Sequence, residues 1–481
     1  MKTGQTKWIR FFWIPLIFIK AVSASSLEVW LLCFPLLTIR KVNNKHLVNL
    51  LIIQKIYDHT ITPLRNAVRN FVRNRKARKG KKAIFNKFKN GEKLKIALMV
   101  ERPGMWCFDY LYNILKNDSR FEVLVVIMPE PFYGKLQMKK YLKETEEEML
   151  QKGYTPLLGY DKDTNEIINF RSLVNPDIIF YTDFWKPHFY NEFYIDNFLD
   201  KITLLTEYGY SVMQDEKTCG FELNNLVDLY FRPTEIHKKM AQEIMENKGQ
   251  NVIVTGSPKL DERFDENYKP QDVWKKQDKK KKRIIWAPHY TDVMPADMYA
   301  NDAFWYIYDF MLDLAEKYKD SVQFVFRPHP VLYTKMIKKW GEYITKKYYK
   351  QWDTLENGQV FMGNFIDLFM TSDAMIMDSC SFRAEYTSFD KPLFYTITET
   401  SRLVINEFGE ELHKNFYVPD GNLEKGIESF IQDVVINGND YKALGRHKLV
   451  EQYFGKINGH TASENIYNEI IKFLEKGEIK K

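Results

Sequence analysis

From residue 94 onward, short apolar and β-branched runs alternate with polar stretches that have helical periodicity. A first series of such runs covers residues 94–100, 122–128, 177–181, 202–206, 227–231 and 251–255. A second series covers residues 283–287, 322–326, 374–377 and 393–396. Buried runs that alternate with helical segments predict parallel sheets with helices on both faces. A lysine-rich connector at 268–282 separates the two series, so we expect two doubly wound, Rossmann-like domains with a cleft between them.

The N-terminal region has a different pattern. Residues 8–39 are rich in Trp, Phe, Leu and Ile, but Arg10, Lys20 and Glu28 interrupt them. A membrane-spanning helix needs about 20 apolar residues, and the longest uncharged run here, 29–39, is much shorter. A cleaved signal peptide is disfavoured because the apolar character resumes beyond Ser26. We therefore expect residues 1–64 to be a helical segment at the membrane interface, anchored by its aromatic residues.

The charge distribution also favours a position of the N-terminal region at a membrane surface. The chain has 481 residues and a formal net charge of +7, yet residues 1–95 alone hold 21 Lys and Arg against three acids, so the rest is acidic. Residues 65–93 are expected to form a basic linker helix near anionic lipid headgroups. Two alternatives stay open: a solvated charge run, or an RNA-binding tail assisted by Phe71, Phe85 and Phe88. We favour the membrane surface and predict no nucleic-acid partner.

Composition limits the remaining classes. With 45% hydrophobic and 28% charged residues, the chain is neither disordered nor collagen-like. Its four cysteines form no CxxC pair, which disfavours a disulfide framework and fits a reducing cytoplasm. We expect a peripheral protein on the cytoplasmic face of the membrane.

Three loops of the second series carry the candidate chemistry. Each follows an apolar run: Pro288-His289, then Arg327-Pro328-His329-Pro330, then Asp378-Ser379-Cys380-Ser381. In a parallel sheet all three loops lie on one edge and converge on one ligand. Arg327 and His329 suit a phosphate, and His329 as an imidazolium suits a leaving phosphate. Ser379 and Ser381 either bind phosphate at a helix start or simply cap that helix.

The same residues carry a family resemblance. The motifs, in order, are Gly256-Ser257-Pro258-Lys259-Leu260-Asp261, Trp286-Ala287-Pro288-His289, Arg327-Pro328-His329-Pro330, the run Ser372 to Ser381, and Lys391-Pro392-Leu393-Phe394-Tyr395. Together they resemble the CDP-glycerol glycerophosphotransferase family of teichoic-acid primases and polymerases.

The resemblance implies a GT-B-like fold. It implies an acceptor domain at 94–255, a CDP-donor domain at 256–460, and a C-terminal helix at 461–481 that crosses back to the first domain. The implied enzyme transfers glycerol phosphate, or a similar alcohol phosphate, from CDP-glycerol or a related donor to a hydroxyl of a lipid-linked glycan or polymer and releases CMP.

The resemblance also implies roles for individual residues. Ser379 and Ser381 would hold the pyrophosphate, while Arg327 and His329 would neutralise the departing CMP. Asp378 and Glu385 match acidic positions of the family and would order the loop or contact glycerol or ribose hydroxyls.

One departure from the family concerns the general base. Family polymerases carry a Trp-His-Gly-Thr-like turn in the first domain, where this chain reads Glu207-Tyr208-Gly209-Tyr210. Glu207 and His289 are the remaining candidates for the base, and His289 is equally suited to bind phosphate as a second cation.

Other functions and cofactors remain to be weighed. Without a base, the chain would be a membrane-attached nucleotide-binding protein without turnover; a GT-B nucleotide-sugar glycosyltransferase is a further alternative. No structural metal is predicted, because the other histidines, His188 among them, show no metal-ligand spacing. Mg²⁺ is the one cofactor that we consider, although the only DxD pair, Asp161 and Asp163, has the character of a turn.

Overall fold

The computed structural model describes residues 6–11, 14–23, 26–31, 34–42, 45–49, 62–212, 220–290, 299–300, 302–379, 382–399 and 401–478. The chain divides into two compact units, Met1–Gly80 and Lys81–Lys481, and each is described by itself. Among the described helices, none combines the length and the apolar character needed to cross a membrane.

The first unit contains an antiparallel sheet in place of the predicted interfacial helix. Its strands, in sheet order, are β1 (Thr6–Phe11), β2 (Ile14–Ser23), β3 (Ser26–Leu31), β4 (Phe34–Val42) and β5 (Lys45–Asn49). The register pairs aromatic positions, with Trp8 opposite Phe18 and Phe18 opposite Trp30. The helical expectation is therefore wrong over these strands, because β-branched and aromatic residues favour strands over helix. The other residues of segment 1–61 lie outside the described part.

Helix α2 (Thr62–Lys89) is the predicted basic helix, and its last turns belong to the second unit. There Lys81 forms an ion pair with Asp228 at 2.6 Å, and Lys87 forms one with Asp177 at 2.8 Å. Phe85 is buried and its ring contacts that of Phe473 at 5.5 Å. Phe85 is thus part of a hydrophobic core and is not free to stack on a nucleic-acid base.

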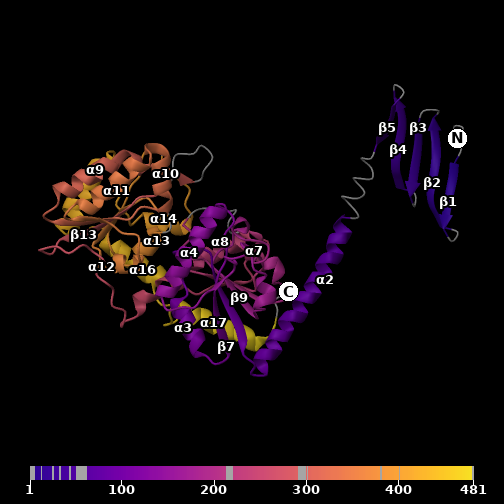
Figure 1. The fold of residues 1–481 in the computed structure, drawn as a ribbon, viewed down its shortest axis with the longest axis horizontal. Coiled ribbons are helices and arrows are strands. Elements are labelled where there is room, and N and C mark those ends of the chain that lie inside the picture. Colours follow the sequence, from indigo (N-terminus) through magenta and orange to yellow (C-terminus); the bar gives the residue numbers. More distant parts are fainter. Residues whose placement is uncertain are drawn as a thin grey trace. The chain divides into compact units, whose positions relative to one another are not determined.

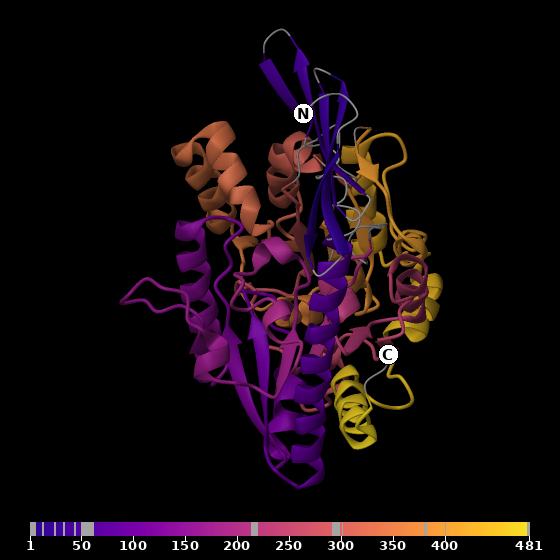
Figure 2. The same ribbon diagram turned by 90° about the vertical axis from the view of Figure 1, so that its right-hand side faces the viewer.

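The first lobe, residues 81–255 with the C-terminal helix, contains a seven-stranded parallel sheet in the described part of the chain (Figure 1, Figure 2). The strand order is β12-β11-β10-β9-β6-β7-β8. The bounds are β6 (Leu94–Val100), β7 (Phe121–Ile127), β8 (Leu157–Leu158), β9 (Ile178–Tyr181), β10 (Ile202–Thr206), β11 (Leu229–Arg232) and β12 (Val252–Val254).

Helices cover both faces of this sheet, which explains why its strands are apolar throughout. On β6, Ile96 and Leu98 enter one core while Ala97 and Met99 enter the other. The first core is completed by α3, α4 and α17, and the second by α5, α7 and α8 with the loops around them. These helices are α3 (Asp109–Asn117), α4 (Lys135–Gln151), α5 (Phe170–Leu173), α7 (Glu222–Leu226), α8 (Glu235–Ile244) and α17 (Ala462–Lys476).

The second lobe, residues 256–460, repeats this architecture with a five-stranded parallel sheet in the order β16-β15-β13-β17-β18. Its strands are β13 (Lys282–Ala287), β15 (Val322–Phe326), β16 (Gly358–Val360), β17 (Ala374–Met377) and β18 (Leu393–Tyr395), with β14 (Tyr299–Ala300) and β19 (Arg402–Leu403) as a separate antiparallel pair. Its α-helices are α9 (Ala303–Lys317), α10 (Pro330–Trp340), α11 (Glu342–Thr354), α12 (Phe365–Thr371), α13 (Phe382–Thr387), α14 (Glu407–His413), α15 (Leu423–Ser429) and α16 (Ala443–Phe454). The predicted GT-B-like arrangement of two α/β lobes is confirmed.

The last helix crosses back to the first lobe, as predicted. Both carboxylate oxygens of Asp261 accept hydrogen bonds from the start of α17, from the N–H groups of Ala462 at 3.0 Å and Ser463 at 2.8 Å. Further along, the Tyr467 hydroxyl donates to Asp118 at 2.8 Å. Figure 1 shows this helix, in yellow, beside α3 of the first lobe.

Candidate active site

The three loops predicted to share a ligand meet at the carboxyl edge of the second sheet. His289 follows β13, His329 follows β15, and Asp378 follows β17. The His289 N–H donates to Oδ1 of Asp378 at 2.6 Å, and the His329 N–H donates to the Pro288 carbonyl at 2.9 Å. The two imidazole ring centroids are 5.0 Å apart. The predicted convergence of the loops is therefore confirmed.

His329 stands at the start of α10 and acts as its N-cap. Its Nδ1 accepts a hydrogen bond from the Val331 N–H at 3.2 Å, which assigns the ring proton to Nε2. Burial lowers the pKa of His329 to about 4, and the positive charge of Arg102 from the first lobe acts in the same direction. Without a ligand, this site thus presents a neutral imidazole with an Nε2–H donor.

His289 and Asp378 are both buried beside this ring. Burial lowers the pKa of His289 well below its ordinary value, and His329 and Arg383 contribute to this shift. Burial also raises the pKa of Asp378 to about 7, against the opposing hydrogen bond from the His289 N–H. Burial therefore favours the neutral form of both groups.

Arg327 supplies a half-buried positive charge beside these loops. Its Nη1 donates to the Phe361 carbonyl at 3.2 Å, and the guanidinium lies 5.8 Å and 5.7 Å from the rings of Phe361 and Phe382. Burial lowers its pKa to about 10, while Glu385 opposes the shift. The buried Nε has no hydrogen-bond partner among the residues that the structure describes. A desolvated guanidinium with an unused N–H is suited to binding an anion.

The remaining predicted donor residues occupy the third loop and α13. The Ser379 carbonyl accepts a hydrogen bond from Nε of Arg383 at 3.2 Å. Glu385 is fully buried, and its Oε1 lies 3.0 Å from Nζ of Lys259. Ser381 lies outside the described residues.

Glu207, a predicted base, follows β10 in the first lobe. Its Oε1 accepts hydrogen bonds from the Tyr230 hydroxyl and from Nη1 of Arg232. Arg232 is almost completely buried and needs a counter-charge there. This geometry gives Glu207 a structural role as the counter-charge of Arg232.

Sequence reasoning missed side chains that connect the two lobes. Nζ of Lys259 lies 5.6 Å from the ring of Tyr208 in the first lobe, in addition to its ion pair with Glu385. Arg102 follows β6 and acts electrostatically on His329. Both residues could have been chosen from the sequence as candidates. Lys259 lies within the Gly256–Asp261 motif, and Arg102 lies just beyond the end of an apolar strand.

The structure offers little for a metal ion. Within the ranges that it describes, no group of three or more His, Cys, Asp and Glu side chains is arranged to hold one. Oδ1 of Asp161 accepts hydrogen bonds from the N–H groups of Asp163 at 2.8 Å and Thr164 at 3.0 Å, which is the turn expected for this pair.

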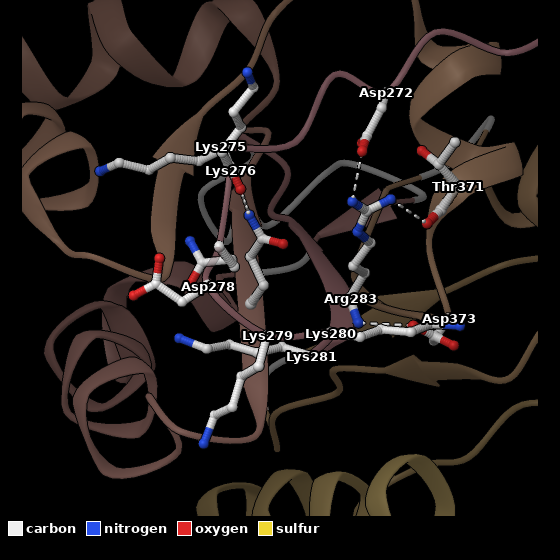
Figure 3. A pocket seen from close by; sticks show the side chains of 12 residues that line it. Asp272, Lys275, Lys276, Asp278, Lys279, Lys280, Lys281, Arg283, Thr371 and Asp373 are labelled. Atoms are coloured by element: carbon white, nitrogen blue, oxygen red, sulfur yellow. Dashed lines mark hydrogen bonds and ion pairs between the residues drawn. The ribbon is translucent and has the colours of Figure 1, made fainter.

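A lysine-rich pocket lies at the opposite edge of the second sheet (Figure 3). Its lining includes Arg283 and Gln323 at the amino ends of β13 and β15, together with Lys275–Lys281 of the connector. Nη2 of Arg283 pairs with Asp272 at 2.9 Å. Because ligands of parallel α/β sheets bind at the carboxyl ends of the strands, this pocket is not the donor site.

Two α/β lobes with parallel sheets, and strand-end loops that meet at the carboxyl edge of the second sheet, define a GT-B-like fold. The family model described as CDP-glycerol:poly(glycerophosphate) glycerophosphotransferase matches residues 203–472, more than half of the chain, and the protein belongs to this family. It is therefore a transferase that moves glycerol phosphate from CDP-glycerol.

Two solved structures with TM-scores of 0.51 and 0.50 show the same fold. The S. aureus MnaA–UDP complex is 16% identical, with a TM-score of 0.51 over 81% of this chain and 98% of that one. A UDP-N-acetylglucosamine 2-epimerase is 15% identical, with a TM-score of 0.50 over 81% and 98%. A variant of the wall teichoic acid polymerase TagF is 12% identical, with a TM-score of 0.49 over 87% and 98%. Among curated protein sequences none matches this chain.

Proposed function

We propose that the enzyme holds CDP-glycerol at the loops around His289, Arg327 and Asp378 and transfers its glycerol phosphate to a hydroxyl of a lipid-linked glycan or polymer. The observation that carries this proposal is the contact of His289 with both Asp378 and His329, inside the region matched by the family model. Three strand-end loops that share one cluster can hold one diphosphate.

The charge distribution of the cluster supports a role in phosphoryl transfer. Arg327 offers its buried Nε–H to a phosphate oxygen, and His329 offers its Nε2–H. A bound diphosphate places negative charge beside the His329 ring, which raises its pKa from about 4 and favours the imidazolium. In the transfer step the acceptor oxygen bonds to the phosphorus of the glycerol phosphate, the bond from that phosphorus to CMP breaks, and His329 donates a proton to the leaving CMP.

The other predicted residues surround this centre. Asp378 fixes the His289 backbone at 2.6 Å, and the loop that contains Ser379 and Ser381 would hold the pyrophosphate by similarity to the family. Glu385 is paired with Lys259, which supports its proposed role of ordering this loop. His289, which is neutral in the free enzyme, would act as a second phosphate ligand.

A panel of donors tests this function. CDP-glycerol, CDP-ribitol, UDP-sugars and GDP-sugars are compared for binding and for release of CMP, UDP or GDP, with and without Mg²⁺. We expect binding of CDP-alcohols with CMP release, and an approximately 100-fold slower release in His329→Ala. The exposed His447→Ala serves as the matched control. Stabilisation by UDP- or GDP-sugars alone would indicate a glycosyltransferase, and CDP-glycerol binding without CMP would indicate a binding protein.

We also propose that the enzyme works at the cytoplasmic face of the membrane. A lipid-linked acceptor stays at the bilayer, and residues 1–95 combine aromatic residues with 21 Lys and Arg. Deletion of residues 1–64 should release the protein from vesicles that contain anionic lipid while CMP release from CDP-glycerol persists. Unchanged flotation with such vesicles would contradict the proposed anchor.

A further inference from the structure

A second buried cluster of ionisable side chains lies at the carboxyl edge of the first sheet. It comprises Glu101 and Arg102 after β6, Glu130 after β7, and Asp183 and His188 after β9. Because β6 lies between β9 and β7, these three strand ends are direct neighbours. The two carboxylates and the imidazole nearest one another, those of Glu130, Asp183 and His188, are each more than nine-tenths buried.

His188 and Asp183 form an oriented pair. Nδ1 of His188 is hydrogen-bonded to Oδ2 of Asp183. The other carboxylate oxygen of Asp183 accepts hydrogen bonds from the N–H groups of Phe184 at 2.6 Å and Trp185 at 2.9 Å. The carboxylate is thus held in place, and it assigns the ring proton to Nδ1. The lone pair of Nε2 is left on the opposite side of the ring.

That opposite side faces Glu130. Nε2 of His188 lies 3.4 Å from Oε1 of Glu130, yet neither this nitrogen nor either oxygen of Glu130 has a hydrogen-bond partner among the described residues. Burial raises the pKa of Glu130, while Arg102, whose Nη1 lies 3.5 Å away, opposes the shift. Buried polar atoms are normally hydrogen-bonded, so this arrangement indicates a place for a ligand hydroxyl.

Aromatic rings surround the imidazole. The ring centroids of Trp185, Phe132 and Tyr133 lie 4.6, 5.4 and 6.5 Å from that of His188. Phe132 and Tyr133 are 47% and 45% exposed, so they form the solvent side of the cluster. Aromatic walls with a few buried polar groups are typical of small-ligand sites.

Arg102 connects this cluster with the donor site. Its guanidinium donates from Nη1 to the Tyr133 hydroxyl at 3.4 Å and faces Glu130. The same positive charge contributes to the lowered pKa of His329 in the second lobe. The first-lobe cluster therefore lies within electrostatic reach of the proposed leaving-group acid.

We infer that His188 is the general base of the transfer reaction, oriented by Asp183, and that Glu130 accepts a hydrogen bond from a second hydroxyl of the acceptor. The inference rests on the proposed function and names the base that the Glu207–Tyr210 turn lacks. The acceptor is a polyol or sugar that enters past Phe132 and Tyr133. Its hydroxyl proton moves to Nε2 of His188, its oxygen bonds to the phosphorus, and the bond from phosphorus to CMP breaks with its electron pair going to CMP.

The experiment uses the full chain, CDP-glycerol and an octyl-linked tri(glycerol phosphate) as the acceptor probe. We expect His188→Gln and Asp183→Asn to slow transfer by about 100-fold to 1000-fold, while the Kd for CDP-glycerol stays within twofold of wild type. The exposed His447→Gln is the matched control and stays fully active. In His188→Gly, added imidazole should restore transfer, with a pH dependence that follows the titration of free imidazole. The wild-type profile depends on the charges that face His188, which are Asp183, Glu130, Glu101 and Arg102.

The outcomes separate the two proposals. A wild-type enzyme that binds no CDP-glycerol, or releases no CMP, overturns both. An active wild type with a His188→Gln variant above half of its rate overturns only the inference. Equal loss of donor binding and of transfer, without imidazole rescue, indicates a structural role and overturns it as well. If His188→Gly does not fold, the isosteric Asp183→Asn carries the same expectation, and its full activity would have the same consequence.

Discussion

Lys259 and Glu385 form a buried ion pair, with Nζ and Oε1 3.0 Å apart and side chains that are 9% and 0% exposed. Lys259 follows the last strand of the first lobe, and Glu385 lies on α13 directly after the third donor loop. Nζ also lies 4.9 Å from the ring of Phe365, which keeps water away from the pair. The pair thus connects the passage between the lobes to the loop that contains Ser379.

Removing one partner of this ion pair should destabilise the folded protein. Lys259→Met leaves the carboxylate of Glu385 buried without its nearest counter-charge, which should lower the free energy of unfolding by about 3–5 kcal/mol. The double variant Lys259→Met, Glu385→Leu should recover most of that loss. Urea unfolding of both variants measures the difference, with the exposed pair Lys346 and Glu342 as the control. A double variant that is less stable than Lys259→Met would contradict the prediction.

Donor binding should take up a proton through His329. The pKa of the ring is about 4 in the free enzyme and rises beside a bound diphosphate, so binding favours the protonated form between these two values. Affinity for CDP-glycerol should therefore fall as pH rises from 5 to 8, by at most about tenfold per unit. Titration calorimetry in buffers of different ionisation enthalpy measures the number of protons that are taken up when CDP-glycerol binds. In His329→Gln this uptake should be absent. An equal uptake in this variant would assign the proton elsewhere.

Substitution of Arg327 should have opposite effects on thermal stability and on CDP-glycerol binding. Its pKa is lowered to about 10 because burial disfavours the charge, so Arg327→Met should leave the melting temperature unchanged or raise it. The same substitution removes the guanidinium that we assign to the diphosphate and should weaken CDP-glycerol binding by about 10-fold to 100-fold. Thermal unfolding and calorimetry on one preparation test both parts. Normal donor affinity would remove Arg327 from the site.

We expect His237 to contribute to the loss of folding stability at low pH. Its Nε2–H donates to the Ser211 carbonyl at 2.8 Å, and burial lowers its pKa from 6.5 to about 3. Below pH 6.5 the unfolded chain binds a proton that the folded chain does not, so stability falls as pH falls toward 3. The slope contributed by this one group is at most about 1.4 kcal/mol per pH unit.

The matched variant for this prediction is His237→Gln, which keeps a donor without the titration. Its urea midpoint should be lower than that of wild type at pH 7 and should fall less steeply toward pH 4. Asp378 and Asp261, with pKa values raised to about 7 and about 6, act in the opposite direction, and the comparison cancels their effect. Parallel curves for the two proteins would show that His237 does not contribute.

The sequence predicted the parts of the fold that depend on local apolar runs. Strands β10, β15 and β17 begin and end at the predicted residues, because each is a short run buried on both faces. The meeting of the loops after β13, β15 and β17 was predictable for the same reason, since a parallel sheet places its strand ends on one edge. The helical prediction was wrong over β1–β5 because aromatic and β-branched residues favour strands.

The environment of His188 could not be predicted from the sequence. Its partner Asp183 is nearby in sequence, but Glu130 comes from a different strand end and reaches the imidazole only through the order β9-β6-β7. Metal-ligand spacing in the sequence did not single out His188, because the residues around its imidazole are brought together by the order of the strands in the sheet. Likewise, Arg327 lies against Phe361, which follows β16, and Phe382, which begins α13, and no local pattern reveals these contacts.

The final helix also determines when the protein can complete its folding. Ile466, Ile470 and Leu474 of α17 belong to the same core as β6, although more than 350 residues separate them in the chain. During synthesis the strands of the first lobe leave the ribosome before α17, so the core of this lobe stays open until residues 462–476 have been made. The lobe that is made first is thus the last to be finished, and a nascent chain stalled anywhere before residue 462 exposes an unfilled hydrophobic groove to chaperones.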